Sequence, residues 1–314
     1  MDTTTGRNPS KEYPYFDEDI SVDLVNARMD GQADPRLKEV MSVVVKHLHA
    51  AVKEIQPTHE EWLAAIGFLT RVGQMCTEWR QEYILLSDTL GVSMLVDAIN
   101  HRRPSGATEN TILGPFYVPN APRYPHGANI CLDGKGEPLL VRGRVIDTDG
   151  NVVEGAMIDV WQTNEDGFYD VQQKDLQPDF NLRGVFISDY DGSYSFRSVK
   201  PRFYPIPNDG PVGKLLGSLG RHPNRAAHIH VIVTAPGFDP VITHIFSPDC
   251  PYLAEDAVFG VKKTLIADFN KVDDPAAIAS NEFDGPYWMV EWDFTLAKEV
   301  TATSIIKTGP PRSG

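Results

Sequence analysis

The sequence has little of what marks membrane, secreted or nucleic-acid-binding proteins. No segment approaches the roughly 20 consecutive apolar residues that span a bilayer. Only three cysteines occur, Cys76, Cys131 and Cys250, and their scattered spacing fits buried thiols in a reducing compartment better than a disulfide framework or a zinc site. Basic residues number 29 against 43 acidic ones, and the net charge of -14 opposes binding to nucleic acid or anionic lipid.

The N-terminal segment, residues 1–15, is polar and has no basic start followed by an apolar stretch. It therefore predicts no secretory signal, and with the cysteines it predicts a cytoplasmic location. The share of hydrophobic residues, 41%, and of charged residues, 23%, is ordinary for globular proteins, which argues against a disordered or collagenous chain. With 314 residues, the chain can form one large domain or two modest ones.

The first third of the chain shows the spacing of helices. Apolar residues recur every three or four positions over residues 37–55, which predicts an amphipathic helix. Thr58 and Glu61 have the spacing of a capping box and predict the start of a second helix. Residues 82–100 predict a third. The sequence therefore predicts an N-terminal helical domain, residues 1–104.

Beyond this boundary, over residues 105–314, short strands and turns replace the helices. The pair Asp191–Gly192 separates the apolar segments 186–189 and 194–199, which predicts a β-hairpin. Frequent turns between short strands predict an antiparallel β-sandwich, so the expected fold class is α+β. Further strands are predicted at residues 139–147, 152–161, 228–235, 241–247 and 287–296.

Two histidines in the segment RHPNRAAHIHVIV are candidates for metal binding. His228 and His230 are two residues apart in a predicted strand, so both imidazoles point to the same face. A pair of neutral imidazoles on a rigid strand suits iron, zinc or copper. The spacing alone leaves open the alternative of two surface or hydrogen-bonded histidines.

Tyrosines, rather than carboxylates or cysteines, occur where further ligands are expected. Tyr204 lies between prolines in PRFYPIPNDG, and Tyr169 follows the turn in NEDGFY. A phenolate is a hard anionic ligand that favours ferric iron. Each tyrosine taken alone is more often a core residue with a hydrogen-bonded hydroxyl than a metal ligand.

Together these motifs resemble a known family. The segments DVWQTNEDGFYDVQ, SDYDGSYSFRSVKPRFYPIPNDGPVG and GRHPNRAAHIH are similar to the intradiol ring-cleavage dioxygenases, and the likeness extends over about residues 37–294. The resemblance implies that one non-haem Fe(III) per subunit is held by four residues, Tyr169, Tyr204, His228 and His230. It also implies that Tyr204 leaves the metal during turnover and that Arg225, otherwise explained by a surface ion pair, stabilises negative charge on the ring.

The segment ILLSDTLGVSMLVDAIN, residues 84–100, resembles the catechol-type members, which carry an N-terminal helical domain. That likeness implies a homodimer joined by the helices, often with a lipid-like molecule between them. The segments FYDVQ, GRHPNRAAHIH and YLAEDAVFGVK resemble the hydroxyquinol 1,2-dioxygenases. They imply that the protein uses O2 to cleave hydroxyquinol, benzene-1,2,4-triol, to 3-hydroxy-cis,cis-muconate and its tautomer maleylacetate. Cleavage of catechol or a chlorocatechol is the alternative.

The resemblance also implies a set of substrate-binding residues. Asp88 is the polar side chain suited to a third ring hydroxyl, and its alternative explanation is a carboxylate on a helix surface. Ile112 and Leu113 differ from the Val-Phe pair expected of a hydroxyquinol enzyme, which leaves the preferred ring open. The full set comprises Leu85, Asp88, Ile112, Leu113, Gly114, Pro115, Phe116, Ile206, Pro207, Arg225 and Val258.

Two other classes of function share parts of this pattern. A zinc or ferrous hydrolase uses an H-x-H pair, but it requires a carboxylate ligand, and metal analysis distinguishes it. A non-catalytic carbohydrate-binding or transthyretin-like β-sandwich also has short strands with buried tyrosines. Such a protein binds no stoichiometric iron and consumes no oxygen with catechol.

Overall fold

The structure is a computed structural model and describes residues 15–29, 34–78 and 80–299. The polar start of the chain, on which the prediction about secretion rests, lies almost wholly outside these residues. The chain forms two compact units, Met1–Arg71 and Val72–Gly314. None of the described helices is both long and apolar enough to cross a bilayer.

The first unit is helical, with α1 (Ser21–Ala27), α2 (Pro35–Ile55) and the greater part of α3 (His59–Met75). The side chain of Asp34 caps α2 by accepting the N–H groups of its first turn. At α3 the predicted capping box is confirmed: Glu61 accepts from the N–H of Thr58 at 2.8 Å, and the Thr58 hydroxyl accepts from the N–H of Glu61 at 3.2 Å.

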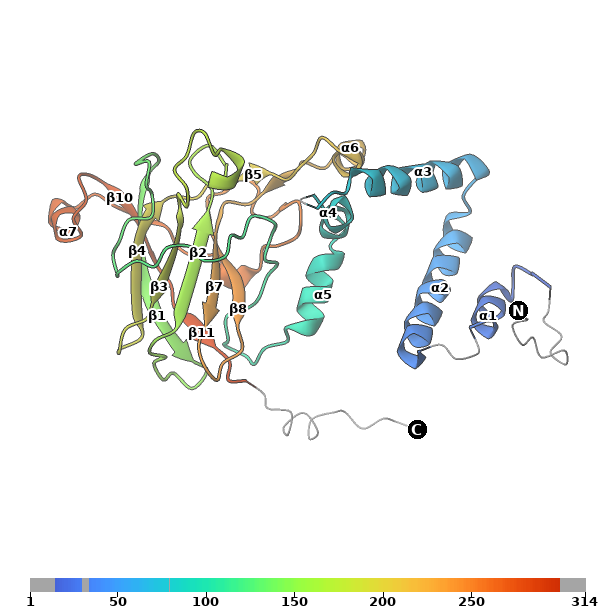
Figure 1. Cartoon of the computed structure of the whole chain (residues 1–314), viewed down its shortest axis with the longest axis horizontal. Helices are drawn as coiled ribbons and strands as arrows, with labels where there is room; N and C mark the ends of the chain where they lie inside the picture. The colour runs from blue at the N-terminus through green and yellow to red at the C-terminus, as the bar shows by residue number, and fades with distance from the viewer. Residues whose placement is uncertain (1–14, 30–33, 79, 300–314) are drawn as a thin grey trace, which may run out of the picture. The chain divides into compact units, whose positions relative to one another are not determined.

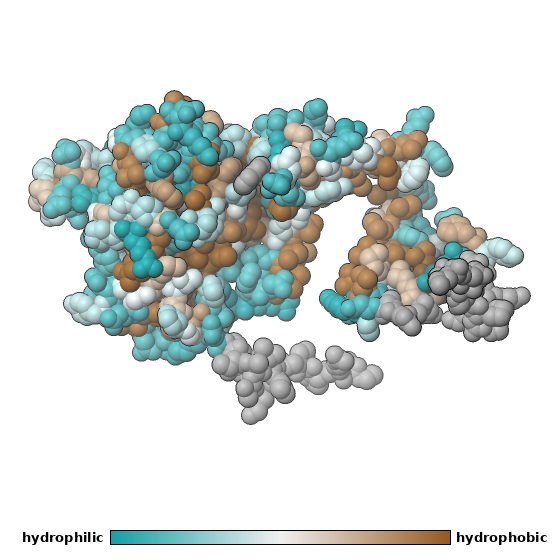
Figure 2. All heavy atoms as spheres, viewed as in Figure 1, coloured by the Kyte–Doolittle hydropathy of each residue, from teal (hydrophilic) through white to brown (hydrophobic). Residues whose placement is uncertain are grey.

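Many apolar side chains of α2 and α3 remain exposed, as the brown spheres over these helices show in Figure 2. Leu48 is 59% exposed and Trp62 is 51% exposed. Soluble monomers rarely leave such rows of large apolar residues uncovered. The exposed residues of this unit include Leu37, Val40, Val44, Leu48, Val52, Ile55, Trp62, Leu63, Ile66 and Leu69.

In the second unit the third predicted helix is divided into α4 (Glu82–Thr89) and α5 (Val92–Asn100). The break falls at Gly91, whose φ of +73° is a left-handed conformation that a helix interior does not contain. Two short helices, α6 (Pro211–Ser218) and α7 (Pro275–Ser280), and the 3-10 turns η1 (Asp170–Gln172) and η2 (Lys263–Leu265) lie in connections.

Two sheets form the β-sandwich of this unit (Figure 1). One has the order β11-β1-β10-β9, with β4 also pairing β1; the other has the order β3-β2-β7-β8. The predicted α+β class with an antiparallel sandwich is confirmed, and β1 differs locally because it runs parallel to β10 and β11. The strands are β1 (Pro138–Asp147), β2 (Met157–Gln162), β3 (Arg183–Ile187), β4 (Ser193–Val199), β5 (Tyr204–Pro205), β6 (Asn224–Arg225), β7 (His228–Thr234), β8 (Val241–Phe246), β9 (Asn270–Val272), β10 (Tyr287–Glu291) and β11 (Phe294–Leu296).

The predicted hairpin around Asp191–Gly192 is wrong in its pairing, although the turn is present. β3 pairs with β2 and β4 pairs with β1, so the turn carries the chain from one sheet to the other. The physical reason is the apolar face of each strand. Phe186 of β3 and Phe196 of β4 stack in the core with ring centroids 5.2 Å apart, and this burial across the sandwich replaces a hairpin ladder.

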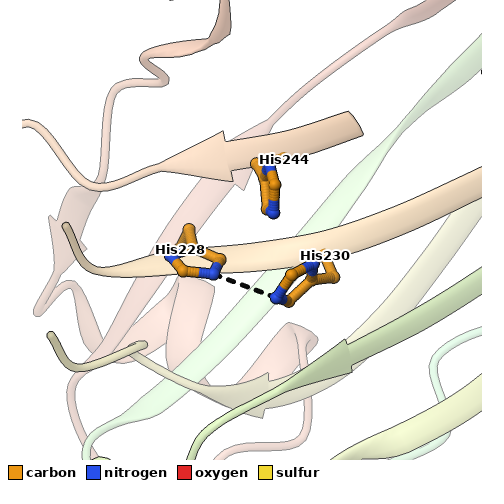
Figure 3. Close-up of side chains that lie close together, drawn as sticks. All are labelled: His228, His230 and His244. Carbon is orange, nitrogen blue, oxygen red and sulfur yellow. Dashed lines mark hydrogen bonds between the residues drawn. The ribbon is translucent and has the colours of Figure 1, made fainter. Parts of the chain in front are cut away.

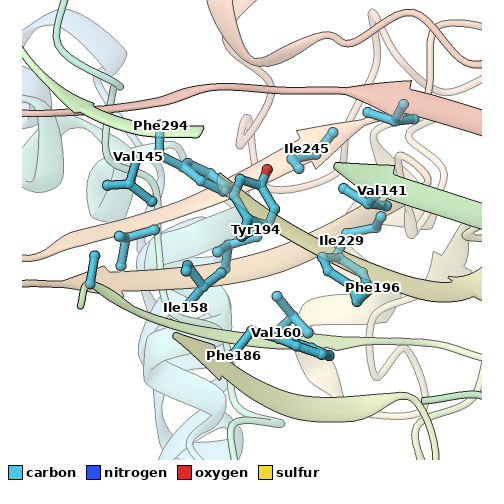
Figure 4. Packing of buried hydrophobic residues seen from close by; sticks show 14 of the residues in the cluster. Val141, Val145, Ile158, Val160, Phe186, Tyr194, Phe196, Ile229, Ile245 and Phe294 are labelled. Carbon is cyan, nitrogen blue, oxygen red and sulfur yellow. The ribbon is translucent and has the colours of Figure 1, made fainter. Parts of the chain in front are cut away.

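The core lies between the two sheets (Figure 4). On β7, Ile229, Val231 and Val233 enter the core and are fully buried. Because side chains alternate along a strand, His228 and His230 point to the opposite, outer face of this sheet. The core packing therefore fixes the face on which the two histidines lie.

Candidate metal centre

The two histidines predicted as ligands lie side by side on β7 with their ring nitrogens converging. The Nε2 atoms of His228 and His230 are 3.0 Å apart, and both side chains are buried. Nδ1 of His228 is 2.5 Å from the carbonyl oxygen of Ala226, which only accepts hydrogen bonds. Nδ1 therefore carries the proton, and Nε2 of His228 presents a lone pair to its neighbours.

The two predicted tyrosines approach these histidines from separate connections. The Tyr169 hydroxyl is 2.9 Å from Nε2 of His230 and donates to the Tyr204 hydroxyl at 3.2 Å. Tyr169 immediately precedes η1, where its backbone N–H donates to the side chain of Gln172 at 2.9 Å. Tyr204 lies on β5, which pairs with β6 at Arg225. The structure thus brings all four predicted side chains to one point.

Gly167 permits the turn before Tyr169 to pack closely on the second tyrosine. Its φ is +84°, and a Cβ at this position would lie 2.9 Å from the carbonyl oxygen of Phe203 and 3.2 Å from Cβ of Tyr204. Both the left-handed backbone and the close approach therefore require glycine. Gly167 in NEDGFY therefore determines how closely the phenols of Tyr169 and Tyr204 approach each other.

The spacing of these four side chains fits ligands around one cation. An imidazole nitrogen binds a metal ion such as zinc at about 2.0–2.1 Å, so neighbouring ligands at right angles are separated by about 3 Å. The observed separations are 3.0 Å between the imidazoles, 2.9 Å from Tyr169 to His230 and 3.2 Å between the phenols. The donor atoms already stand at the distances that a shared ion requires.

Electrostatics favours a cation at the same point. Burial lowers the pKa of His228, His230 and His244 well below the usual value, so the three rings are neutral, the form that binds metals. Burial also raises the pKa of Tyr169 well above its usual value, against the charges of Arg225 and Arg183. A phenolate in this position therefore depends on a neighbouring positive ion.

Arg225 lies beside the four side chains and is itself held in place. Its Nη1 is 3.4 Å from the Tyr204 hydroxyl and 3.4 Å from Nε2 of His228. Burial lowers the pKa of Arg225, but Tyr204 and Asp256 outweigh that effect and raise it. Asp256 lies 3.6 Å from Nε of Arg225 and accepts from the N–H groups of Ala226, Val258 and Gly260. The arginine is therefore a fixed positive charge at the edge of the site.

Aromatic side chains pack against the candidate ligands. Trp161 of β2 stacks on His230 with centroids 4.6 Å apart and planes 9° apart, and Phe116 stacks on Tyr169 at 4.6 Å. Arg183 lies over the Tyr169 ring at 5.8 Å, donates to the carbonyl oxygen of Phe116 at 2.8 Å and pairs with buried Asp170 at 2.6 Å. These contacts restrict the rotation of both rings.

Several of the predicted substrate-binding residues gather next to this centre. Ile206 and Val258 form a buried cluster against which Leu85 and Ile112 pack. Gly114, with φ of +75°, lies so close to His230 that a Cβ would be 3.2 Å from Cε1 of that ring. Phe116 touches Tyr169 as described. Leu113, Pro115 and Pro207 are exposed and adjoin these residues in sequence.

Asp88 is half-buried on α4, and its carboxylate interacts with Arg225 and accepts a hydrogen bond from Ser93. Burial raises the pKa of Asp88 against these two influences. The helix is tied to the segment that carries Tyr204: fully buried Glu82 accepts from the N–H of Val212 at 3.1 Å and pairs with Arg80. Asp88 is therefore a partly desolvated carboxylate that interacts electrostatically with the arginine.

A third imidazole, which the sequence does not predict to lie here, stands beside His228 and His230. His244 on β8 is the direct cross-strand partner of His230, and the three histidines form a group that could hold a metal ion (Figure 3). The sequence does predict residues 241–247 as a strand, and His244 lies within it. The sequence did not reveal which residue of that strand lies opposite His230, since register depends on tertiary pairing.

Two family models and several known proteins are similar to this chain. A family model described as "Dioxygenase" matches residues 112–297, and one described as "Catechol dioxygenase N terminus" matches residues 34–108. The hydroxyquinol 1,2-dioxygenase of a Rhizobium species is 63% identical over 285 residues, 90% of this chain and 97% of that protein. The 6-chlorohydroxyquinol 1,2-dioxygenase of Cupriavidus pinatubonensis is 44% identical over 90% of this chain and 98% of its own length. The solved structure of a hydroxyquinol 1,2-dioxygenase from Pseudomonas putida superposes with a TM-score of 0.85 at 44% identity, covering 90% of this chain and 99% of that one.

Proposed function

The chain belongs to the intradiol ring-cleavage dioxygenases, and from this premise we propose that it cleaves hydroxyquinol with O2 to 3-hydroxy-cis,cis-muconate, the enol tautomer of maleylacetate. The observation that carries the proposal is the convergence of Tyr169, Tyr204, His228 and His230 at about 3 Å spacing beside Arg225. The names of the similar proteins support hydroxyquinol as the ring, with catechol and chlorocatechols as the alternative.

We propose that the four converging side chains hold one Fe(III) per subunit. Two phenolates and two neutral imidazoles form a donor set of the kind that hard ferric iron prefers, and no carboxylate is needed to balance its charge. Ferric iron bound there supplies the redox chemistry through which an electron-rich ring reacts with O2. The nearby Asp170 pairs with Arg183 and is not free to act as a zinc-type carboxylate ligand.

The residues around the proposed iron have distinct tasks. The phenolate oxygen of Tyr204 accepts one proton of the incoming diol, while Tyr169 remains in place because Phe116 and Arg183 pack on its ring. Arg225 donates toward the negative charge that builds on the opened ring, and a fixed donor in a buried site needs no rearrangement to do so. Asp256 keeps the guanidinium in that position.

The colour of the purified protein tests the metal assignment. Phenolate-to-iron charge transfer should make iron-loaded protein wine-red. Tyr204→Phe should weaken the absorption band and slow turnover, whereas Tyr169→Phe should remove most of the iron. A colourless iron-loaded protein, or spectra unchanged in both variants, contradicts the proposal. Stoichiometric zinc in place of iron would favour a hydrolase.

Oxygen uptake tests the choice of ring. Consumption with hydroxyquinol, 4-chlorocatechol and catechol is measured side by side, and hydroxyquinol should give the highest catalytic efficiency. The carboxylate of Asp88, which interacts electrostatically with Arg225, supports this order, because it offers an acceptor for a third ring hydroxyl. A preference for catechol or 4-chlorocatechol would select the alternative, and no uptake with any of them would favour a non-catalytic β-sandwich.

We further propose that two copies of the chain pair through the N-terminal helices, with a lipid-like molecule between them. The exposed apolar rows of α2 and α3 support this assembly, because Leu48 and Trp62 alone leave more than half of their surface in water. Sedimentation of the purified protein should give a dimer, and extraction of it should release a lipid. A monomer at micromolar concentration contradicts the pairing.

The functional division of the chain is proposed at residues 1–104 for the helical domain and 105–314 for the iron-binding sandwich. The two family matches support it, since one ends at residue 108 and the other begins at residue 112. We also propose a cytoplasmic location. The three free cysteines, Cys76, Cys131 and Cys250, support a reducing compartment.

A further inference from the structure

His244 stands next to the candidate ligands without being one of the four. Its ring centroid is 4.2 Å from that of His230 and 4.6 Å from that of His228, and its side chain is fully buried (Figure 3). In the sheet, Trp161, His230 and His244 are successive cross-strand partners on β2, β7 and β8. His230 is therefore flanked by the indole on one side and by the third imidazole on the other.

One ring nitrogen of His244 is fixed by a threonine. Nδ1 forms a short hydrogen bond with the hydroxyl of buried Thr111. The backbone N–H of Thr111 donates in turn to the carbonyl oxygen of Ile242 at 2.8 Å, which anchors the threonine to the strand of His244. Thr111 immediately precedes Ile112, which packs in the predicted substrate-binding cluster. The orientation of the imidazole is thus linked to that segment.

The other ring nitrogen has no partner in the part of the chain that the structure describes. Nε2 of His244 is buried and unpaired there. Each of the three histidines offers a ring nitrogen within 4.8 Å of the others, so the His244 ring lies beside the point where the four side chains converge. Buried polar atoms in native proteins are with few exceptions hydrogen-bonded. The nitrogen is therefore available to hydrogen-bond a molecule bound at this point.

The surroundings decide which form of the ring fits. Nε2 of His228 presents a lone pair, because its Nδ1 carries the proton toward Ala226. That lone pair is directed to the proposed iron, so it does not occupy Nε2 of His244, which has no partner among the described residues. The Thr111 hydroxyl can donate to Nδ1 of His244, and the single proton of the neutral ring then lies on Nε2. In this tautomer His244 is a hydrogen-bond donor and cannot be a metal ligand.

Building on the proposed function, we propose that His244 is a further substrate-binding residue and Thr111 its positioning residue. The Nε2–H of His244 donates a hydrogen bond to an anionic oxygen of the aromatic diol bound beside the four ligands. Thr111 keeps the ring in the tautomer and orientation that this bond requires. Hydrogen bonds to charged groups are the strong ones, so the loss of this donor should be measurable in binding.

The test measures binding without turnover. Under argon, the change in absorption of the iron-loaded protein on adding hydroxyquinol gives its dissociation constant, and iron per chain is determined on the same samples. His244→Leu should retain iron and the resting absorption but weaken binding about 10- to 150-fold, the range of a hydrogen bond to a charged group. Thr111→Val should weaken binding in the same direction, and Thr111→Ser should restore it.

Thr243→Val is the matched control. Thr243 is a buried threonine next to His244 on β8. Its side chain lies on the opposite face of the strand from that of His244 and donates to the carbonyl oxygen of Glu109 at 2.8 Å. Its loss should leave the dissociation constant of hydroxyquinol unchanged. If Thr243→Val weakens binding as much as Thr111→Val, the effect is one of strand stability and the inference is wrong.

Other outcomes separate this inference from the proposed function. Loss of iron in His244→Leu would make His244 a metal ligand and overturn the donor role. Unchanged binding in His244→Leu and in Thr111→Val would show that both residues contribute only to packing and would overturn the inference. If His244→Leu does not fold, the Thr111 pair still decides, because valine keeps the shape of threonine. Wild-type protein without iron would instead overturn the proposed function itself.

Discussion

Replacing Asp88 by asparagine should change which ring the enzyme prefers. The carboxylate is half-buried on α4, accepts from Ser93 and interacts with Arg225, so it is held close to the site rather than free in water. A hydrogen bond to a charged group contributes about 1.5–3 kcal/mol. Since about 1.4 kcal/mol corresponds to a factor of ten, Asp88→Ala, which removes the acceptor, should lower kcat/KM for hydroxyquinol about 10- to 150-fold, and Asp88→Asn, which keeps a neutral acceptor, should lower it less.

The informative quantity is the ratio of kcat/KM for hydroxyquinol to that for catechol. Removing the negative charge also changes the field at Arg225, and that effect is common to both rings because both are opened beside the same guanidinium. The ratio cancels the common effect and keeps the contribution of the third hydroxyl. Asp88→Asn and Asp88→Ala should both lower it, and the loss should appear mainly with hydroxyquinol.

Oxygen uptake over a range of substrate concentrations gives the two constants, and thermal denaturation shows whether the variants are folded. Asp97→Asn is a suitable control, because Asp97 is a buried carboxylate on the neighbouring helix α5 that pairs with His101 and Lys262. It should leave the ratio unchanged. Equal losses on hydroxyquinol, 4-chlorocatechol and catechol in Asp88→Asn would refute the reasoning and make Asp88 a structural residue.

Three further predictions concern the surroundings of the site. Gly114→Ala should cost about 1–2 kcal/mol of stability and lower the iron content, because φ is +75° and the new Cβ would lie 3.2 Å from the His230 ring; unchanged iron per chain would contradict this. Arg183→Met should cost about 3–5 kcal/mol in urea denaturation by leaving Asp170 buried and unpaired, and Asp170→Asn added to it should recover part of the loss. Burial raises the pKa of Asp159 from 3.8 to about 6, so ionisation destabilises the fold as pH rises between these values. Asp159→Asn, which still accepts from Tyr117, should therefore have a higher Tm than the parent at pH 7, and the difference should disappear below about pH 4.

The sequence predicted those parts of the molecule that local patterns determine. The helices beginning near Pro35 and His59, and the Thr58–Glu61 capping box, followed from periodicity and end signals. The four proposed ligands were predicted because the short motifs that contain them resemble those of a known family. That these side chains meet is now an observation, while their binding of iron stays a prediction.

What the sequence did not reveal depends on contacts between distant segments. The turn at Asp191–Gly192 gave no sign that its strands belong to different sheets, because both pairings bury the same apolar residues. His244 was overlooked since only the register of β7 and β8 brings it to His230. The roles of Asp256 and Glu82 likewise follow from hydrogen bonds to backbone groups far away in the chain or across a turn.

The proposed ligands come from two kinds of backbone, which matters for protein engineering. His228 and His230 lie in the interior strand β7, hydrogen-bonded to β2 on one side and β8 on the other. Tyr169 and Tyr204 come from short connections outside these sheets. A mutant library aimed at new ring substituents should therefore vary the other residues of the connections, keep Gly167 and the two tyrosines, and spare the strand. Changes in the connections can alter the shape of the site around the substrate ring, while His228 and His230 stay in place.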